Sequence, residues 1–158
     1  METGDTGNDL RWLDPDEKEV WTGLLSLLLL LPGRLESPLQ QSHGLTLFEY
    51  LVLSHMSEAP QRRLRMSELA FLANGSLSRL SNVVKRLERR EWVERSPDPD
   101  DGRYTIAALT GAGLAVLQDA APTHLRSVRE LALDRLDADD RAALARIAGR
   151  LRVRPREF

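Results

Sequence analysis

The segment from Ser67 to Arg103 restricts the possible folds of this chain more than any other part of the sequence. It reads SELAFLANGSLSRLSNVVKRLERREWVERSPDPDDGR. Its apolar spacing predicts a short helix, then a turn in which Asn74 and Gly75 are both left-handed, and then a longer helix. A short hydrophobic strand and a loop rich in Pro, Asp and Gly follow, and together they indicate a β-hairpin. Two helices followed by a hairpin suit a protein that places one helix in a DNA groove and reaches a neighbouring groove with a loop.

The longer helix, over residues 76–90, is predicted to have two different faces. At about 100° per residue, one arc is apolar and holds Leu77, Leu80, Val83, Val84 and Leu87. The opposite arc has four cations, one amide, two hydroxyls and no acid, and it consists of Ser78, Arg79, Ser81, Asn82, Lys85, Arg86 and Arg89. A helix face that is only solvated usually mixes charges of both signs for i,i+4 pairing. A basic face without acids therefore favours contact with phosphates and base edges over simple solvation.

The hairpin is expected to have strands at 92–96 and 104–109, with a loop that ends at Arg103. An ordinary polar turn is the simpler interpretation of this loop. That interpretation is weakened because the loop ends in arginine and follows a basic helix. The three aspartates of the loop would repel phosphates. We therefore expect them to fold the loop and to hold Arg103 through hydrogen bonds, so that Arg103 is left to enter a minor groove.

The net charge of -2 conceals an uneven distribution of charged residues. Residues 1–58 carry three Arg or Lys against ten Asp or Glu, whereas residues 62–95 carry nine Arg or Lys against four Glu. Overall acidity therefore does not argue against a nucleic-acid partner, because the basic residues are concentrated locally.

The first helix is predicted to begin at Asp14, an N-cap residue that is followed by Pro15 at the first helical position. It continues through the leucine-rich run 24–31, and we expect Pro32-Gly33 to kink or break it before it resumes to about residue 41. Leucine covers nearly all faces of this helix. A helix that is apolar all round needs more than its own domain to bury it, so a dimer partner is expected on its free side.

The other elements are predicted mainly from their caps. Thr46 and Glu49 form a T-x-x-E capping box for a helix to about residue 58, and 62–66 favours a single edge strand. Ser67, Thr110 and Asp137 are expected to cap the next helices. We expect a kink at Pro122, within a helix that resumes through Leu125, Val128, Leu131, Leu133 and Leu136. Inward-facing side chains are predicted at Leu69, Ala70, Leu72 and Ala73, and the last helix has a stripe of Leu144, Ile147 and Leu151.

The predicted fold is mainly α with a small antiparallel β-wing: a winged helix-turn-helix lobe plus a long-helix dimerisation region. The expected parts are a flexible N-terminal arm (1–13), N-terminal dimerisation and support helices (14–58), the DNA-binding lobe (59–110) and C-terminal dimerisation helices (111–158).

Several classes of function find no support in the composition. The chain has no cysteine, so disulfides, thiolate metal sites, cysteine nucleophiles and thiol-based redox sensing are excluded. His43, His55 and His124 show no metal-ligand spacing, and we expect no metal or cofactor. Glycine-rich phosphate loops, HExxH and a nucleophile elbow are all missing, so an enzyme is not expected. No signal peptide is apparent, and the apolar run 24–31 is too short to span a membrane; we expect a soluble cytoplasmic protein.

From about residue 14 to residue 152 the chain resembles the MarR family of bacterial winged-helix regulators. The most specific part of the resemblance is R-x-x-x-x-V-x-R-L-E-x-x-x-W-V-x-R-x-P-x-P-x-D-x-R, from Arg79 to Arg103. The resemblance implies a homodimer whose first and last helices interleave and which presents two recognition helices and two wings to palindromic DNA. It also implies that Asp101 and Arg103 form the D-x-R motif of the wing. One departure is Glu91, which stands where the family usually has glycine.

The function favoured by these features is a homodimeric DNA-binding transcriptional regulator, expected to be a repressor that a small aromatic or amphipathic ligand releases. The predicted DNA-contacting residues are Ser76, Ser78, Arg79, Ser81, Asn82, Lys85, Arg86, Arg89 and Arg103. Ligand-lining candidates are Trp21, His43, Tyr50 and His55, although ordinary core or surface roles remain an alternative for them. The alternative function is a winged-helix module for protein–protein contact without nucleic acid, which would not explain the acid-free basic face.

Overall fold

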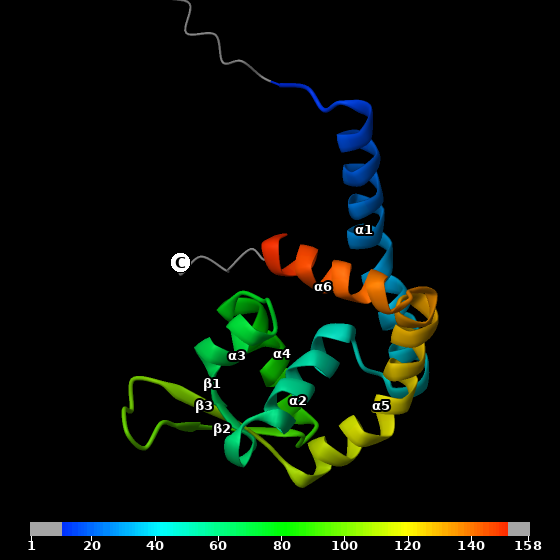
Figure 1. Cartoon of the computed structure of the whole chain (residues 1–158). Coiled ribbons are helices and arrows are strands. Elements are labelled where there is room, and N and C mark those ends of the chain that lie inside the picture. Colours follow the sequence, from blue (N-terminus) through cyan, green and yellow to red (C-terminus); the bar gives the residue numbers. More distant parts are fainter. Residues whose placement is uncertain (1–10, 152–158) are drawn as a thin grey trace, which may run out of the picture. The chain divides into compact units, whose positions relative to one another are not determined.

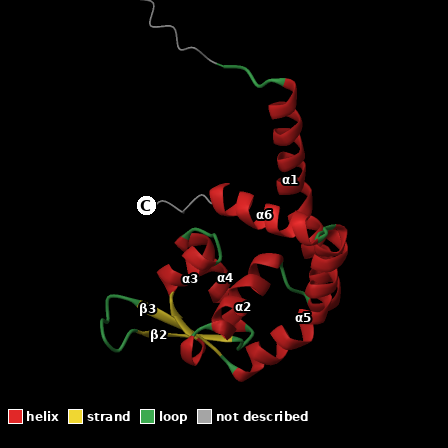
Figure 2. Cartoon of the chain, in the orientation of Figure 1, coloured by secondary structure: helices red, strands yellow, loops and turns green. Residues whose placement is uncertain are grey.

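A computed structural model describes residues 11–151 of the chain. Its helices and strands follow one another along the chain as shown in Figure 1. They are α1 (Pro15–His43), α2 (Leu47–Glu58), the 3-10 turn η1 (Pro60–Arg62), β1 (Arg63–Arg65), α3 (Met66–Leu72), α4 (Leu77–Arg89), β2 (Val93–Pro97), β3 (Thr105–Leu109), α5 (Gly111–Leu131), the 3-10 turn η2 (Leu133–Arg135) and α6 (Ala138–Leu151). The prediction of a mainly α fold with a small antiparallel sheet is confirmed (Figure 2). Most of the predicted N-terminal arm and the C-terminal tail lie outside the described residues.

The chain divides after Gly33 into two compact units. Helix α1 begins as predicted: the Glu17 N–H donates to Asp14 Oδ1 at 2.9 Å, and the Asp14 N–H donates to Glu17 Oε2 at 3.1 Å. The predicted break at Pro32-Gly33 is wrong, because α1 is helical through both residues. A proline removes only one helical hydrogen bond, and the leucine-rich turns before it are good helix formers.

Helix α5 ends earlier than predicted. It is helical through Pro122, but it stops at Leu131. Leu133 lies in the turn η2, and Leu136 follows that turn in extended backbone, so neither residue belongs to α5. The N-cap predictions at Thr110 and Asp137 are confirmed, since the side-chain oxygens of these residues accept the N–H groups of Gly113 and Asp140 at 3.0 and 2.8 Å. Local caps were therefore predicted better than helix lengths.

The sheet has three antiparallel strands in the order β1-β3-β2. Ala107, at the centre of β3, pairs with Leu64 of β1 on one side and with Arg95 of β2 on the other. The short strand β1 therefore lies at an edge, as predicted. Leu64, Ala107 and Val93 are all buried, which places one face of this small sheet against the helices of the second unit.

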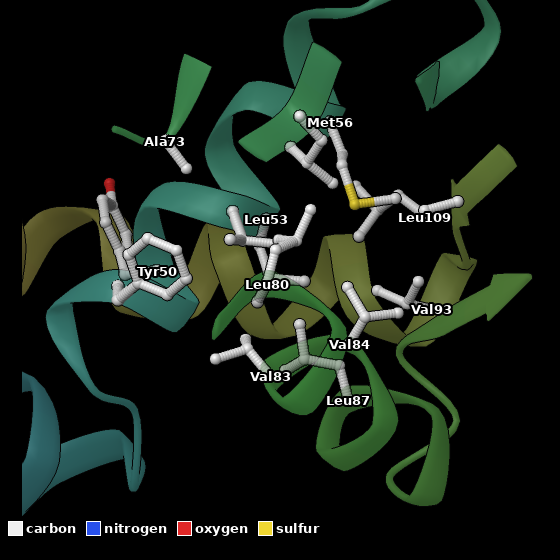
Figure 3. Packing of buried hydrophobic residues seen from close by; sticks show 14 of the residues in the cluster. Tyr50, Leu53, Met56, Ala73, Leu80, Val83, Val84, Leu87, Val93 and Leu109 are labelled. Atoms are coloured by element: carbon white, nitrogen blue, oxygen red, sulfur yellow. The ribbon is translucent and has the colours of Figure 1, made fainter. Parts of the chain in front are cut away.

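The hydrophobic core of the second unit joins α2, α3, α4 and the sheet. Leu53 of α2, Leu80 and Val84 of α4, and Val93 of β2 are fully or almost fully buried, and Figure 3 shows their side chains converging. The buried face of α4 is formed by four of the five residues predicted for it. The packing of this face holds α4 with its opposite, polar face turned outward.

Three local predictions about this region were wrong. Leu77 is 53% exposed and Leu72 is 37% exposed, although both were expected to face inward. Each lies off the buried stripe of its helix, by about 70° for Leu77 and about 110° for Leu72. Ser67 is not an N-cap, because α3 already begins at Met66, whose side chain is buried where β1 ends.

The turn between α3 and α4 depends on two neighbouring residues with different roles. Asn74 takes the left-handed conformation, with a φ of 52°, and ends α3 as predicted. Gly75 was also predicted to be left-handed, but its φ is not positive. A glycine is needed there for space, since a Cβ at this position would lie 2.6 Å from Phe48 Cζ.

Helix α4 ends in a Schellman motif with Glu91 at its left-handed position. The Trp92 N–H donates to the Leu87 carbonyl at 3.0 Å, and the Glu91 N–H donates to the Glu88 carbonyl at 2.8 Å. The φ of Glu91 is 59°. Glu91 therefore adopts the backbone conformation that glycine would have at this position and bears the steric cost of its Cβ.

Replacing Glu91 with glycine is expected to raise the free energy of unfolding by about 0.5–1 kcal/mol, because glycine has no Cβ to strain the left-handed backbone. Urea unfolding followed by circular dichroism measures this change. Glu91→Ala is the matched control: it removes the carboxylate but keeps the Cβ, so it should give little gain. An equal gain from both variants would show that charge, and not backbone strain, limits stability at this position.

Candidate nucleic-acid interface

Helix α4 is capped at its N-terminus, and its apolar face is buried, so its polar face points outward. The hydroxyl of Ser76 accepts the N–H of Arg79 at 3.2 Å, which satisfies one of the free donors of the first turn. Six polar-face residues with cationic, amide or hydroxyl groups are exposed on α4 after the Ser76 cap. They are Ser78, Arg79, Asn82, Lys85, Arg86 and Arg89; Ser81 is half-buried.

One flank of this face is held by α2. The guanidinium of Arg79 lies over the ring of Phe48, 4.1 Å from its centroid. Arg86 Nε donates to Glu49 Oε1 at 3.1 Å, and this carboxylate is almost completely buried. The sequence indicated Glu49 as a capping residue, and the structure confirms that box. Nothing in its T-x-x-E spacing indicated that the same carboxylate also binds α4.

Three other residues of the polar face, Asn82, Lys85 and Arg89, have no such side-chain partners among the described residues. Among the side-chain hydrogen bonds and ion pairs found in residues 11–151, none involves Asn82, Lys85 or Arg89. Lys85 and Arg89 line an open hollow of about 550 Å³ together with Glu88. Glu88 is not a free negative charge there, since Arg95 Nη2 donates to its Oε2 at 2.6 Å. The exposed part of α4 is therefore electrostatically positive.

Figure 2 shows the loop between β2 and β3 in green. Of the three aspartates expected to fold this loop, Asp98 and Asp101 form side-chain hydrogen bonds within it. Asp98 is buried and accepts the Asp100 N–H at 2.9 Å and Arg65 Nε at 2.6 Å. These two hydrogen bonds hold the pKa of Asp98 below its ordinary value, with the backbone N–H as the largest cause. Because Arg65 belongs to β1, this ion pair connects the base of the loop to the far edge of the sheet.

Asp101 holds the arginine at the tip of the loop. It accepts Arg103 Nη2 at 2.6 Å and Arg103 Nε at 2.9 Å, and it also accepts the Arg103 N–H at 3.2 Å. The side-chain hydrogen bond from Arg103 is the main cause that lowers the pKa of Asp101. The side chain of Arg103 remains 84% exposed. Asp101 thus orients Arg103 without burying it.

The predicted ligand-lining residues have different surroundings within their own units. His43 contacts α5, with Nδ1 3.0 Å from Asp119 Oδ2 and Nε2 3.0 Å from Thr123 Oγ1. Tyr50 is buried, and its ring centroid lies 4.3 Å from that of His124. His55 is half-buried on α2, whereas Trp21 lies in the unit before Gly33 and is half-exposed.

His124 is a residue that the sequence did not point to. Burial lowers its pKa, and its Nδ1 is buried without a hydrogen-bond partner among the described residues. Burial also raises the pKa of its neighbour Tyr50, and the negative charge of Glu58 adds to that effect. Two of the ligand-lining candidates, His43 and Tyr50, therefore approach adjacent residues of α5.

Within residues 11–151, no group of three or more His, Asp or Glu side chains is arranged to hold a metal ion. None of the helices in that same range combines the length and the apolar character needed to cross a membrane.

Comparison with known proteins gives one consistent result. A family model described as MarR family matches residues 43–103. The transcriptional regulator MhqR of Bacillus subtilis is 33% identical over 92 residues, which are 56% of this chain and 60% of MhqR. The transcriptional repressor NicR of Pseudomonas putida is 40% identical over 65 residues, which are 41% of this chain and 40% of NicR. The match thus spans less than two thirds of either curated relative.

A solved structure covers far more of the chain. Sco3205, a MarR family transcriptional regulator from Streptomyces coelicolor solved in complex with DNA, is 38% identical. The similarity covers 89% of this chain and 91% of Sco3205, with a TM-score of 0.86. The proteins matched are regulators and not enzymes. The chain has the winged helix-turn-helix fold, matches the family model and is similar to Sco3205 over most of its length. It therefore belongs to the MarR family of transcriptional regulators.

Proposed function

We propose that this chain regulates transcription by binding double-stranded DNA through α4 and the β2–β3 loop. The observation that carries the proposal is the exposed, acid-free polar face of α4, with the exposed Arg103 on the adjoining loop. Such a face offers donors to phosphates and to base edges at once. The relative Sco3205 was solved with DNA, which supports this use of the fold. The proposed contact residues are Ser76, Ser78, Arg79, Ser81, Asn82, Lys85, Arg86, Arg89 and Arg103.

The active form in this proposal is a homodimer on a palindromic operator. Val20 and Leu27 to Leu30 of α1 are exposed, as are Leu144, Ile147 and Leu151 of α6. Apolar surfaces of this kind mark interaction sites, and a two-fold axis would bury the same surface on both copies. Residues 14–58 and 111–158 then serve as dimerisation regions on either side of the DNA-binding lobe, 59–110. A two-fold dimer predicts half-sites about one helical turn, or roughly 34 Å, apart.

The regulator is proposed to be a repressor that a small aromatic or amphipathic molecule releases from DNA. The name of NicR, a transcriptional repressor, supports the first part of this proposal. The absence of cysteine removes thiol oxidation as the signal, which leaves a bound molecule as the simpler trigger. His43, Tyr50 and His55 offer rings and polar atoms for such a ligand, and Trp21 stays a predicted contact. Isothermal titration of the dimer with aromatic acids, with and without DNA, tests this part of the proposal.

Replacing Arg103 with alanine is expected to weaken DNA binding by about 10- to 100-fold, because the variant loses a cation aimed at a groove. Fluorescence anisotropy at two salt concentrations, on DNA from upstream of the protein's own gene, measures this loss. Arg129→Ala is the control: Arg129 also pairs with an aspartate (Asp134, 3.3 Å) and is also exposed, but it lies on α5. It should bind DNA as the unmodified protein does.

The outcome of this experiment also decides between DNA binding and protein–protein contact. If Arg103→Ala binds as tightly as Arg129→Ala, the proposed role of the wing is wrong. If the unmodified protein captures no genomic fragment at low salt, the protein–protein module becomes the better account of this fold.

A further inference from the structure

Six of the seven polar-face residues of α4 form two rows that have different surroundings, and the half-buried Ser81 belongs to neither row. At about 100° per residue, Ser78, Asn82, Lys85 and Arg89 fall within an arc of about 60°. Arg79 and Arg86 lie about 60–90° to one side of the centre of that arc. We call the first set the exposed row and the second set the flank. Each row contains two cations, so the rows do not differ in charge. They differ in their contacts with other residues.

The flank is occupied by contacts with α2. Arg79 stacks on Phe48, a buried residue whose ring lies close to Gly75. Arg86 donates through Nε to the buried Glu49. A stacked or paired guanidinium keeps some of its remaining N–H groups free, but it cannot turn toward the centre of the exposed row without breaking its contact. Such a held cation suits a phosphate, whose position on the duplex is the same for every sequence.

The exposed row has one residue with the chemistry to distinguish a base. Asn82 is exposed and lies within 30° or so of the centre of the row. Its side chain takes part in none of the side-chain hydrogen bonds found within residues 11–151. Its short amide offers a donor and an acceptor side by side, which match N7 and the N6 amino group of adenine in the major groove. Ser78 lies one turn earlier and is small, so the helix can approach the base pairs closely at this level.

The other two members of the exposed row fit this role less well. Lys85 and Arg89 lie in the second half of α4 and line the hollow next to the Glu88–Arg95 ion pair. Recognition helices contact base edges mainly with residues of their N-terminal part. Asn82 is in that part of the 13-residue helix, of which it is the sixth residue.

We propose that Asn82 reads one adenine in each half-site, while Arg79 and Arg86, held by Phe48 and Glu49 of α2, bind phosphates without regard to sequence. This inference rests on the proposed function, because it assigns separate tasks within the same DNA-binding surface.

The test selects DNA and then measures discrimination. The full-length unmodified protein first selects its preferred sites from a randomised double-stranded library. Asn82→Ala and Arg79→Ala are then titrated with the selected site and with a set of sites that each carry one substituted base pair. For Asn82→Ala we expect discrimination to fall by about 5- to 150-fold at one A·T pair in each half-site and to stay unchanged elsewhere. For Arg79→Ala we expect all sites to weaken by the same factor and the logarithmic salt slope to fall by about 1.

Each result supports or overturns the assignment. The assignment is overturned if the Asn82→Ala variant keeps full discrimination at every position, or if it binds all sites more weakly by the same factor. It is also overturned if the Arg79→Ala variant prefers a different base at any position. An unmodified protein that binds DNA but selects no sequence also overturns the inference, although DNA binding itself would stand. If the unmodified protein binds no DNA at all, the proposed function fails first. Circular dichroism serves as the folding control, and we expect both variants to be folded because both side chains are exposed.

Discussion

Gly113→Ala is expected to lower the free energy of unfolding by about 2–3 kcal/mol, because it forces a methyl group into fully packed space. A Cβ at this position would overlap the carbonyl oxygen of Trp92 and would lie 2.8 Å from Leu109 Cδ1. The atoms in the way are backbone and buried side chain, so neither can move freely. Thermal or urea unfolding, followed by circular dichroism, measures the loss.

The same substitution is expected to weaken DNA binding. The start of α5 is joined to the turn between α4 and β2, since Thr110 Oγ1 donates to the Glu91 carbonyl at 2.7 Å and the Thr110 N–H donates to the Trp92 carbonyl at 3.1 Å. Moving α5 away from Trp92 would strain both hydrogen bonds. The end of the DNA-facing helix and the first strand of the wing would then shift together.

Gly111→Ala provides the control for Gly113→Ala. Gly111 is in the same first turn of α5, but a Cβ there would have no atom within 4 Å. Alanine should therefore be neutral, or should stabilise the helix by up to about 1 kcal/mol. Equal destabilisation by the two substitutions would mean that helix geometry, and not the contact with Trp92, requires glycine at position 113.

Glu49→Ala is expected to cost about 2–3 kcal/mol, since it removes a helix cap and a charge-assisted hydrogen bond in one step. Glu49 Oε2 accepts the Thr46 N–H at 2.9 Å, and Oε1 accepts Arg86 Nε at 3.1 Å. Arg86 is half-exposed and can regain water, so the loss stays below that for a fully buried pair. DNA affinity should fall as well, because Arg86 is no longer held on the flank of α4.

The control for this substitution is Glu58→Ala on the same helix. Glu58 is exposed in the last turn of α2, so its removal should change stability by less than about 0.5 kcal/mol. Glu49→Gln separates the two contributions, since it keeps a hydrogen-bond acceptor but removes the charge. If Glu49→Ala is as stable as Glu58→Ala, the link from α2 to α4 does not support the fold in the way we describe.

Features that depend on residues close together in the sequence were predicted well. The predicted caps at Asp14, Thr46, Thr110 and Asp137 all accept the backbone N–H of the residue three positions later. The apolar arc of α4 was predicted in the same way, because burial follows the helical period once the helix is known. The hold of Asp101 on Arg103 is equally local, spanning two residues.

Errors arose where the outcome depended on residues far apart. Leu72 and Leu77 were wrongly placed inside, because each lies off the buried stripe of its helix and no other element within the described residues packs over it to bury it. A break of α1 at Pro32-Gly33 was one of the two outcomes expected from a rule for single residues, and the helix instead continues through both residues.

The sequence by itself determined the order of the elements, their caps and the composition of the α4 face, because each of these depends on the covalent neighbourhood of the residues involved. Only the tertiary structure decided which cations of that face are held and which are free. Arg86 meets Glu49 across 37 positions and Arg65 meets Asp98 across 33, so both pairs join segments that are brought together only by the packed fold. No sequence pattern encodes such contacts, since they depend on how the helix and sheet surfaces fit together.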